Sequence, residues 1–357
     1  MECAVVADHD YCSVPETAGL DMAAVKNEEL QKEIELLHRE LKELKMQATF
    51  ELQRFAGSDD DIRFYTRFAS YRHFMMFWGL IEPSVHKKIR KSRARAAERR
   101  NEPVSVVRPA HTSLQPIDEL FLFLMYLAAG LKERDLANRF TIHQSTVSRI
   151  LSSWTNYLYT LLGSVCIWME KEDVKAQKFK EFPDTQVIVD CTELKCQTPS
   201  SLLLQSGMYS AYKSHCTMKG LIGMAPHGAV TFVSSLYERS VSDKELFRRS
   251  GLADLLTDDM GVMVDKGFLI SDVVKCKVYC PPFLQKRSQM LAECVLQTQK
   301  IARLRVHVER VIRRVKENKL FDSVIPLSIA GSINEMYTVA CLLVNYQNKP
   351  LVRAWAK

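Results

Sequence analysis

The stretch Gln186-Val187-Ile188-Val189-Asp190-Cys191-Thr192-Glu193 decides the fold of this chain. Its three consecutive β-branched residues predict a fully buried strand, because such side chains suit a packed, pleated surface. Asp190 follows them directly, where we expect the sheet to meet solvent. Two interpretations are open for it. Asp is a common turn and cap residue, and a carboxylate held rigidly at a strand end can also bind a divalent cation.

Two further acids favour the metal interpretation. Gly261-Val262-Met263-Val264 is a second apolar strand that ends on an acid, Asp265. Asp190 and Asp265 can therefore lie side by side on adjacent strands. Glu309 borders the apolar face of a long, cation-rich helix, and a carboxylate there is costly without a partner. Metal ions would supply that partner, since Mg²⁺ prefers oxygen ligands; an arginine-paired structural glutamate is the alternative.

Length and composition indicate a folded protein of two or three domains. The chain has 357 residues, of which 47% are hydrophobic. Its ten Cys include no CxxC pair and no zinc-type spacing, so no zinc site is expected, and the absence of a signal-peptide pattern predicts reduced thiols. The N-terminus lacks the pattern of a signal peptide. The longest apolar run, Leu120 to Ala129, is too short to span a bilayer, so no membrane partner is expected.

The net charge of +7 is concentrated between His86 and Arg100. Such a block indicates a nuclear-localisation or nucleic-acid-binding segment, or a solvated linker, and these roles are compatible. We therefore expect a basic linker over 83–110, a nuclear protein and DNA as a partner. The block contains one acid, Glu98, and the cations Lys87, Lys88, Arg90, Lys91, Arg93, Arg95, Arg99 and Arg100.

The N-terminal region predicts self-association. Residues 1–23 are expected to be disordered, and residues 24–52 to form a coiled coil that makes a homodimer. The alternative is an amphipathic helix that packs on its own domain. Residues 60–82 carry an aromatic helical stripe that we interpret as core rather than as a base-stacking surface. The heptad seam consists of Leu30, Ile34, Leu37, Leu41 and Leu44.

Residues 112–165 predict a helix-turn-helix domain. An apolar helix ends near Gly130, a short helix covers Lys132 to Phe140, and a third begins at Gln144. This is the order of a DNA-reading helix-turn-helix, and a plain helical bundle is the alternative. A Ser or Thr is available to cap the third helix. The side chains that could reach base edges or phosphates are Gln144, Ser145, Thr146, Ser148 and Arg149.

After Trp168 the pattern changes to short strands and helices. Ala225-Pro226-His227-Gly228 predicts a tight hairpin turn. A mixed sheet flanked by helices, an α/β fold, is the expectation. Strands are predicted at 185–190, 216–224, 230–237, 261–265 and 275–279, and helices at 244–256 and 290–319.

Seven motifs in register carry a family resemblance. Residues 185–345 resemble the DDE-superfamily transposase/endonuclease domain of Harbinger-like and related eukaryotic elements, and the helix-turn-helix from about residue 112 resembles the one that accompanies it. The motifs are Asp190-Cys191-Thr192-Glu193, Tyr209-Ser210-Ala211-Tyr212-Lys213-Ser214-His215, Thr217-Met218-Lys219, Ser240-Val241-Ser242-Asp243, Asp265-Lys266-Gly267-Phe268, Pro281-Pro282-Phe283 and Arg305-Val306-His307-Val308-Glu309-Arg310.

The resemblance implies an RNase H-like nuclease domain, which we place at residues 180–350. It implies cleavage and joining of DNA phosphodiester bonds with Mg²⁺ or Mn²⁺, as two ions. Asp190, Asp265 and Glu309 would be the catalytic, metal-binding acids.

Other residues receive supporting or DNA-contacting roles. Asp243 would orient Arg239 or a ligand, and Glu193 is a reserve acid that could face the metal. His215 would contact DNA or serve as a structural histidine. Contacts to DNA are expected from Lys213, Arg305, Arg310 and Arg313.

The front of the chain departs from several relatives, which carry a zinc-coordinating DNA-binding domain there. This chain has the predicted coiled coil instead, which suggests a separate DNA-binding partner. Three functions stay open: an active endonuclease or transposase, a domesticated nuclear DNA-binding or scaffold protein without catalysis, and a metal-dependent phosphatase or RNase that uses the same acids.

Overall fold

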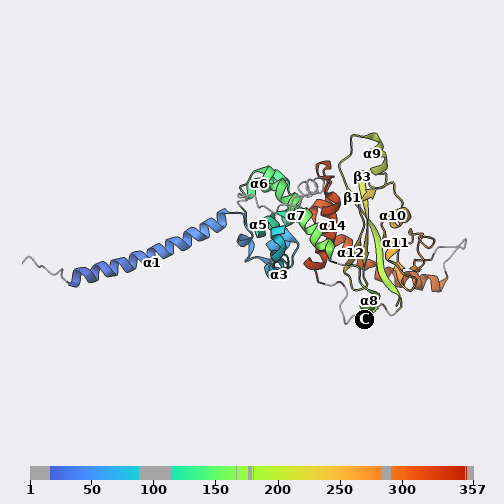
Figure 1. Ribbon diagram of the computed structural model, residues 1–357, viewed down its shortest axis with the longest axis horizontal. Helices are drawn as coiled ribbons and strands as arrows, with labels where there is room; N and C mark the ends of the chain where they lie inside the picture. The colour runs from blue at the N-terminus through green and yellow to red at the C-terminus, as the bar shows by residue number, and fades with distance from the viewer. Residues whose placement is uncertain are drawn as a thin grey trace, which may run out of the picture. The chain divides into compact units, whose positions relative to one another are not determined.

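The computed structural model describes residues 17–87, 114–165, 167–175, 179, 181–282, 291–349 and 351. The chain divides into two units, residues 1–54 and 55–357 (Figure 1). Most of the predicted basic linker and the first 16 residues lie outside the described residues. Within the described part, none of the helices combines the length and hydrophobicity needed to cross a bilayer.

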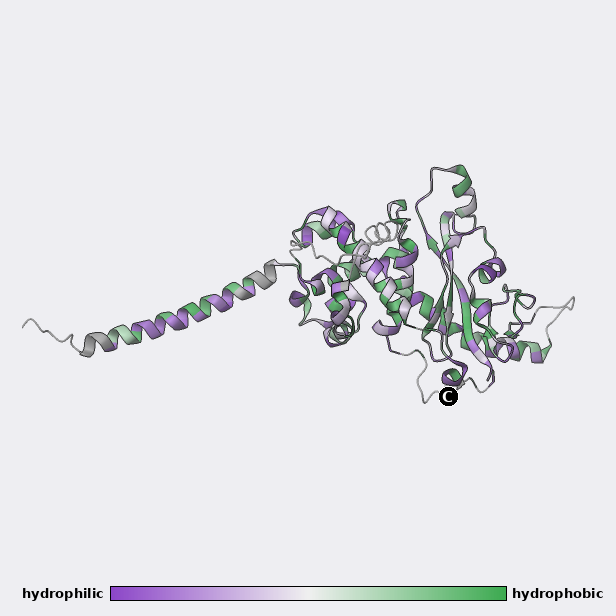
Figure 2. Ribbon diagram, in the orientation of Figure 1, coloured by the Kyte–Doolittle hydropathy of each residue, from purple (hydrophilic) through white to green (hydrophobic). Residues whose placement is uncertain are grey.

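The first unit is dominated by α1 (Thr17–Ala48). This helix begins inside the segment predicted to be disordered, because that segment is rich in the good helix formers Ala, Leu and Met. Apolar and polar residues alternate along it (Figure 2). All five seam residues are exposed in the single chain, Leu37 at 54% and Leu44 at 63%. The coiled coil therefore stays a prediction.

The aromatic segment forms two helices, α2 (Asp59–Thr66) and α3 (Tyr71–Ile81), rather than one. Arg67 closes α2 in the left-handed region at φ 65°, and the side chain of Ser70 caps α3. Phe68 between them is fully buried, with its ring centroid 5.6 Å from that of Phe74 and 5.3 Å from that of Phe77. These rings belong to the core. Two short 3₁₀ helices flank the pair, η1 (Leu52–Phe55) and η2 (Glu82–Lys87).

Three helices give the predicted helix-turn-helix order: α5 (Pro116–Ala129), α6 (Glu133–Arg139) and α7 (Gln144–Ser164). Gly130 ends α5 with φ 64°, and Thr141 turns the chain between α6 and α7 with φ 52°. α6 and α7 pack together, and the apolar residues that both contribute to the core are Leu136, Ala137, Phe140, Val147 and Ile150. A short helix, α8 (Lys171–Lys175), follows.

The second half of this unit is a mixed sheet. Its main path is β2-β3-β1-β6-β7, and β4 and β5 also pair with β3. β1 is antiparallel to β3 and parallel to β6, and β6 is parallel to β7. The predicted hairpin turn connects β3 to β4. The strands are β1 (Thr185–Lys195), β2 (Tyr209–Ser210), β3 (His215–Met224), β4 (Val230–Val233), β5 (Tyr237–Glu238), β6 (Gly261–Met263) and β7 (Lys277–Tyr279).

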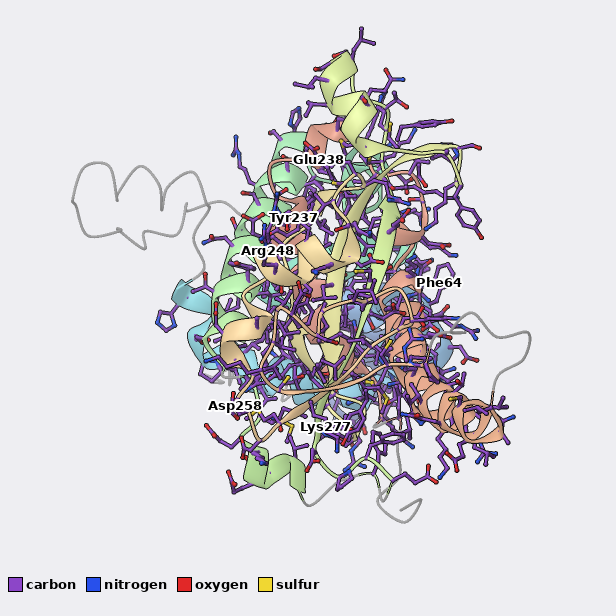
Figure 3. All side chains as sticks on the ribbon, turned by 90° about the vertical axis from the view of Figure 1, so that its right-hand side faces the viewer. Phe64, Tyr237, Glu238, Arg248, Asp258 and Lys277 are labelled. Carbon is purple, nitrogen blue, oxygen red and sulfur yellow. The ribbon has the colours of Figure 1, made fainter. Side chains whose placement is uncertain are left out.

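Helices cover both faces of the sheet. Val187 and Val189 of β1 point to one face, where they pack with Leu246 and Phe247 of α10 (Asp243–Arg249). The long helix α12 (Ala292–Lys316) contacts β1 and β3. Figure 3 places Glu238 toward one end of the sheet and Lys277 toward the other. The remaining helices are α9 (Leu202–Met208), α11 (Leu252–Leu255), α13 (Lys319–Asp322), η3 (Leu327–Ile329) and α14 (Ile333–Gln347).

The helix-turn-helix and the sheet share one interior. α14 packs on both α7 and β4, and α13 packs on α5. The buried side chain of Gln347 donates to the backbone oxygen of Thr66 at 2.9 Å. The guanidinium of Arg67 donates to the backbone oxygen of Ala128 at 2.7 Å. The DNA-reading candidate and the sheet are thus parts of a single packed body.

Candidate active site

The backbone brings Asp190 and Asp265 to the same level of the sheet. Ile188 and Met263 form the last pair of the parallel β1–β6 ladder. Asp190 lies two residues beyond Ile188, and Asp265 lies two residues beyond Met263. The structure thus brings these two acids together on adjacent strands, as expected, and their role as metal ligands stays a prediction.

One detail of that prediction is wrong, because Asp190 does not end its strand. β1 continues to Lys195, since residues 191–195 pair with Leu221 to Thr217 of the long strand β3. Only the β6 side of β1 is unpaired at this level. Asp190 therefore occupies the middle of a strand, at the point where parallel pairing stops.

A single arginine joins the two aspartates. The Arg305 guanidinium donates from Nη1 to Asp265 Oδ1 at 2.7 Å, and its Nη2 lies 3.6 Å from Asp190 Oδ2. The Arg305 side chain is only 10% exposed. This placement differs from the predicted position on a DNA-facing surface, because the helix turns Arg305 toward the sheet. Its contact with DNA stays a prediction.

Burial raises the pKa of Asp190 to about 6. Arg305 and the backbone N–H of Cys191, which donates to Asp190 Oδ1 at 2.9 Å, oppose this shift. The charges of Asp265 and Glu309 add to it. The charges of the three predicted acids therefore influence one another, and burial is the main reason why the charged form of Asp190 is disfavoured.

Glu309 lies on α12, one turn beyond Arg305. As expected, Glu309 borders the buried face of α12, beside the buried Arg305 and Val308, but its own side chain is exposed and does not bear the cost of a buried carboxylate. Across the residues that the structure describes, no three His, Cys, Asp or Glu side chains converge closely enough to hold a metal ion. In this arrangement the counter-charge for Asp190 and Asp265 comes from Arg305.

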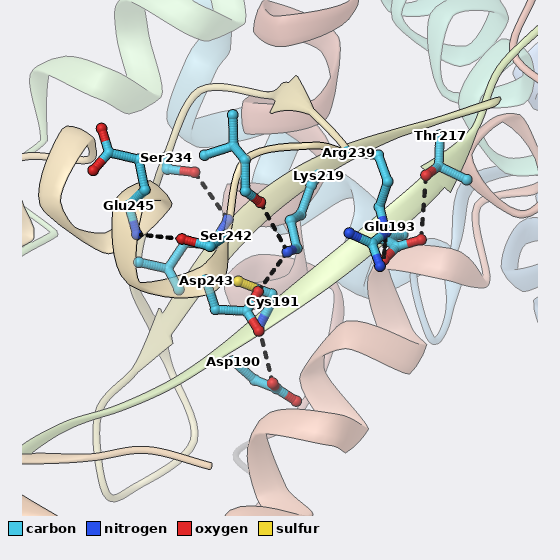
Figure 4. Close-up of polar contacts among 12 residues, drawn as sticks. Asp190, Cys191, Glu193, Thr217, Lys219, Ser234, Arg239, Ser242, Asp243 and Glu245 are labelled. Atoms are coloured by element: carbon cyan, nitrogen blue, oxygen red, sulfur yellow. Dashed lines mark hydrogen bonds and ion pairs between the residues drawn. The ribbon is translucent and has the colours of Figure 1, made fainter. Parts of the chain in front are cut away.

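Glu193 does not face this site. It lies three residues from Asp190 on β1, and side chains alternate between the faces of a strand. Its carboxylate lies 2.9 Å from Arg239 Nε and 3.4 Å from Lys213 Nζ, and it accepts from Thr217 Oγ1 at 3.2 Å (Figure 4). Its prediction as a reserve metal-facing acid is therefore contradicted by this pairing.

Asp243 occupies a supporting position, with a different partner from the one predicted. Its Oδ1 lies 2.6 Å from Nζ of Lys219, which also donates to the backbone oxygen of Val241 at 3.1 Å (Figure 4). Arg239 pairs with Glu193 instead. Burial, followed by the charge and hydrogen bond of Asp243, raises the pKa of the Cys191 thiol, so Asp243 lies directly behind the residue next to Asp190.

The predicted DNA-contacting residues fall into two groups. Arg310 and Arg313 on α12 and His215 at the start of β3 are exposed, whereas Lys213 is half-buried beside Glu193. At the front of α7, His143 is the N-cap instead of a Ser or Thr: its Nδ1 accepts from the backbone N–H of Ser145 at 3.2 Å. A surface groove of about 560 Å³ is lined by Glu133, His143, Gln144, Ser145, Ser148, Arg149 and Ser152.

Sequence reasoning missed two roles at this site. Lys219 received none, although a lysine within the apolar run of β3 signals a buried partner. Arg305 received only a DNA-binding role, although its spacing of four residues from Glu309 places both side chains on neighbouring turns of one helix face. Its two carboxylate partners lie far away in sequence, so no local pattern reports them.

Comparison with protein-family models assigns both parts of the second unit. Residues 189–345 match the DDE superfamily endonuclease model, and residues 112–164 match the helix-turn-helix of DDE superfamily endonuclease. A search of curated proteins and a search of solved structures each found no significant match. The chain carries a DDE superfamily endonuclease domain together with the helix-turn-helix that accompanies it.

Proposed function

We propose that this protein is a divalent-metal-dependent DNA endonuclease of the transposase type, which cuts and joins phosphodiester bonds. The observation that carries the proposal is the placement of Asp190 and Asp265 at one level beyond the last β1–β6 pair. The order of the mixed sheet is consistent with an RNase H-like fold. The match to the endonuclease family supports the same reaction class.

The acids fit hard divalent cations. Asp190, Asp265 and Glu309 offer carboxylate oxygens, the ligands that Mg²⁺ and Mn²⁺ prefer. Burial of Asp190, added to the charges of the other two, makes a bound cation favourable there. These three residues would hold the ions. When bound, such ions activate water or a 3′-hydroxyl and stabilise the leaving oxygen of a phosphodiester.

DNA is the proposed substrate. The exposed front of α7 offers Gln144, Ser148 and Arg149 to base edges or phosphates. Arg310 and Arg313 would meet phosphates near the acids. The basic block after His86 supports nuclear localisation and further DNA contact. The exposed seam of α1 supports a homodimer.

A nicking assay on supercoiled plasmid with Mn²⁺ tests the proposal. Asp190→Asn, Asp265→Asn and Glu309→Gln should each lose at least roughly a hundredfold in rate, since each removes a metal ligand. Glu193→Gln is the matched control, because it removes an acid from the same strand that faces the other side of the sheet. If the three variants nick like the wild type, the assigned site is wrong.

The second candidate is a domesticated, non-catalytic DNA-binding scaffold. It is favoured by the pairing of Asp190 and Asp265 with Arg305, which neutralises part of the acid charge without a metal. It would show strong, salt-dependent DNA binding that chelator leaves unchanged, with no nicking by the wild type.

A further inference from the structure

The cation Arg305 contacts both strand acids of the site. Its Nη1 lies 2.7 Å from Asp265 Oδ1, and its Nη2 lies 3.6 Å from Asp190 Oδ2. The two distances show a firm contact with the more exposed acid and a looser one with the more buried acid. The guanidinium thus lies within reach of both carboxylates.

The position of Arg305 is imposed by its helix. Ile301 and Val308, one turn to either side, are fully buried and fix the face of α12 that meets the sheet. The planar fork of arginine suits two carboxylates at once, which a lysine ammonium does less well. The fold therefore delivers a fixed positive charge to the gap between Asp190 and Asp265.

We infer that Arg305 is a built-in counter-cation that competes with divalent metal ions for Asp190 and Asp265. The inference rests on the proposed function, since it takes these acids as metal ligands. Metal binding then requires the guanidinium to release both carboxylates. Arg305 is a positioning residue in this scheme: it keeps two like charges together in the metal-free protein and gives way when the ions bind.

The competing explanation is a purely structural one, in which Arg305 ties α12 to β1 and β6 and keeps the ligands in place for the metal. The two explanations predict opposite changes in metal affinity when Arg305 is replaced. A competitor weakens metal binding, so its removal strengthens binding. A structural clamp supports metal binding, so its removal weakens it.

Titration calorimetry of Mn²⁺ into the full-length, DNA-free protein separates them. Arg305→Met keeps much of the side-chain length and removes the charge, and we expect it to bind Mn²⁺ roughly tenfold more tightly than the wild type. Arg305→Lys keeps the charge without the fork, so its affinity should fall between the two. Arg303→Met is the matched control, because it removes an exposed cation from the same helix and should change the affinity by less than about twofold.

Thermal unfolding gives a second readout that needs no activity. The rise in melting temperature on adding Mn²⁺ should be larger for Arg305→Met than for the wild type. Arg305→Lys keeps the inference testable if the Met variant does not fold. Affinity that is unchanged or weaker in both Arg305 variants overturns the inference. If Asp190→Asn and Asp265→Asn still abolish binding in that case, the metal site itself stands. If neither the wild type nor Arg305→Met binds Mn²⁺, the proposed function fails with the inference.

Discussion

Asp190 carries a charge that burial opposes and that one arginine offsets only in part. Its neighbours explain the situation: the strand ladder fixes its backbone on the β3 side, while the β6 side is open at that level. An ionised carboxylate in such a position destabilises the metal-free fold. A residue that the proposed chemistry needs thus lowers the stability of the metal-free fold.

The pH dependence of stability should report the destabilisation caused by the ionised Asp190 carboxylate. The folded-state pKa of Asp190, about 6, lies above the ordinary value of 3.8 for an aspartate, so the folded protein holds the proton more tightly. Stability from this group is present at low pH and is lost as the pH rises from about 4 to above 6. Over this pH range, the free energy of unfolding of Asp190→Asn should rise by up to about 3 kcal/mol relative to that of the wild type.

Urea denaturation in the presence of EDTA at pH 4.5 and pH 7.5 measures the difference. Glu193→Gln serves as the comparison, since its carboxylate is paired with two cations on the other face. A wild-type protein whose stability relative to Asp190→Asn is the same at both pH values would contradict the assigned environment of Asp190.

The identity of the two strand acids was predictable, whereas their partners were not. An apolar run followed by an acid is a local pattern, and Asp190 and Asp265 both show it. The links to Arg305, and the pairing of Glu193 with Arg239, depend on how α12 and the β5 turn lie against the sheet. Side-chain partners that are distant in sequence follow from tertiary packing, which local sequence patterns do not report.

At the scale of elements, the front of α7 carries the most specific prediction. Arg149 is exposed and lines the groove beside His143 and Gln144. Arg149→Ala should weaken DNA binding by about tenfold. It should also reduce the slope of log K against the logarithm of the salt concentration by about one, because it removes one cation. Fluorescence anisotropy over a salt series measures both quantities.

A control variant shows whether the effect is local. Arg63→Ala on α2 removes a cation that already pairs with Asp60, so DNA affinity should stay within about twofold of the wild type. Equal losses from both substitutions would indicate that total charge, and not the front of α7, determines binding.

Helices were easier to predict than strand ends. Hydrophobic periodicity located α5, α6 and α7 within a few residues, although the N-cap of α7 is His143 and not the expected Ser or Thr. The predicted strand 185–190 was too short, because the length of β1 is set by its long partner β3 and not by its own apolar run. The predicted strand 230–237 divides into β4 and β5, which pair with different parts of β3.

For the whole molecule, α1 decides the oligomeric state that we expect. Its seam is exposed in the single chain, and an apolar stripe of this length should be covered by a second copy. Leu37→Lys combined with Leu41→Lys should convert a dimer to a monomer, because it places charge in the seam. Light scattering during gel filtration of the full chain measures the mass.

Leu36→Lys provides the matched control for that experiment. Leu36 is as exposed as Leu30, at 48%, but lies outside the seam, so the dimer should persist. A wild-type protein that is monomeric at micromolar concentration would contradict self-association through α1.

Because the helix-turn-helix and the sheet share one interior, the second unit holds α7 at a fixed distance from the acid site. α7 and α14 pack together, and Gln347 fastens the end of α14 to the helical region. If α7 binds a DNA sequence and the acid site cleaves the same duplex, cleavage occurs at a set number of base pairs from that sequence. Adding half a helical turn of DNA between the bound sequence and the cleaved bond would then rotate the scissile phosphate to the far side of the duplex. The phosphate would be out of reach of Asp190 and Asp265.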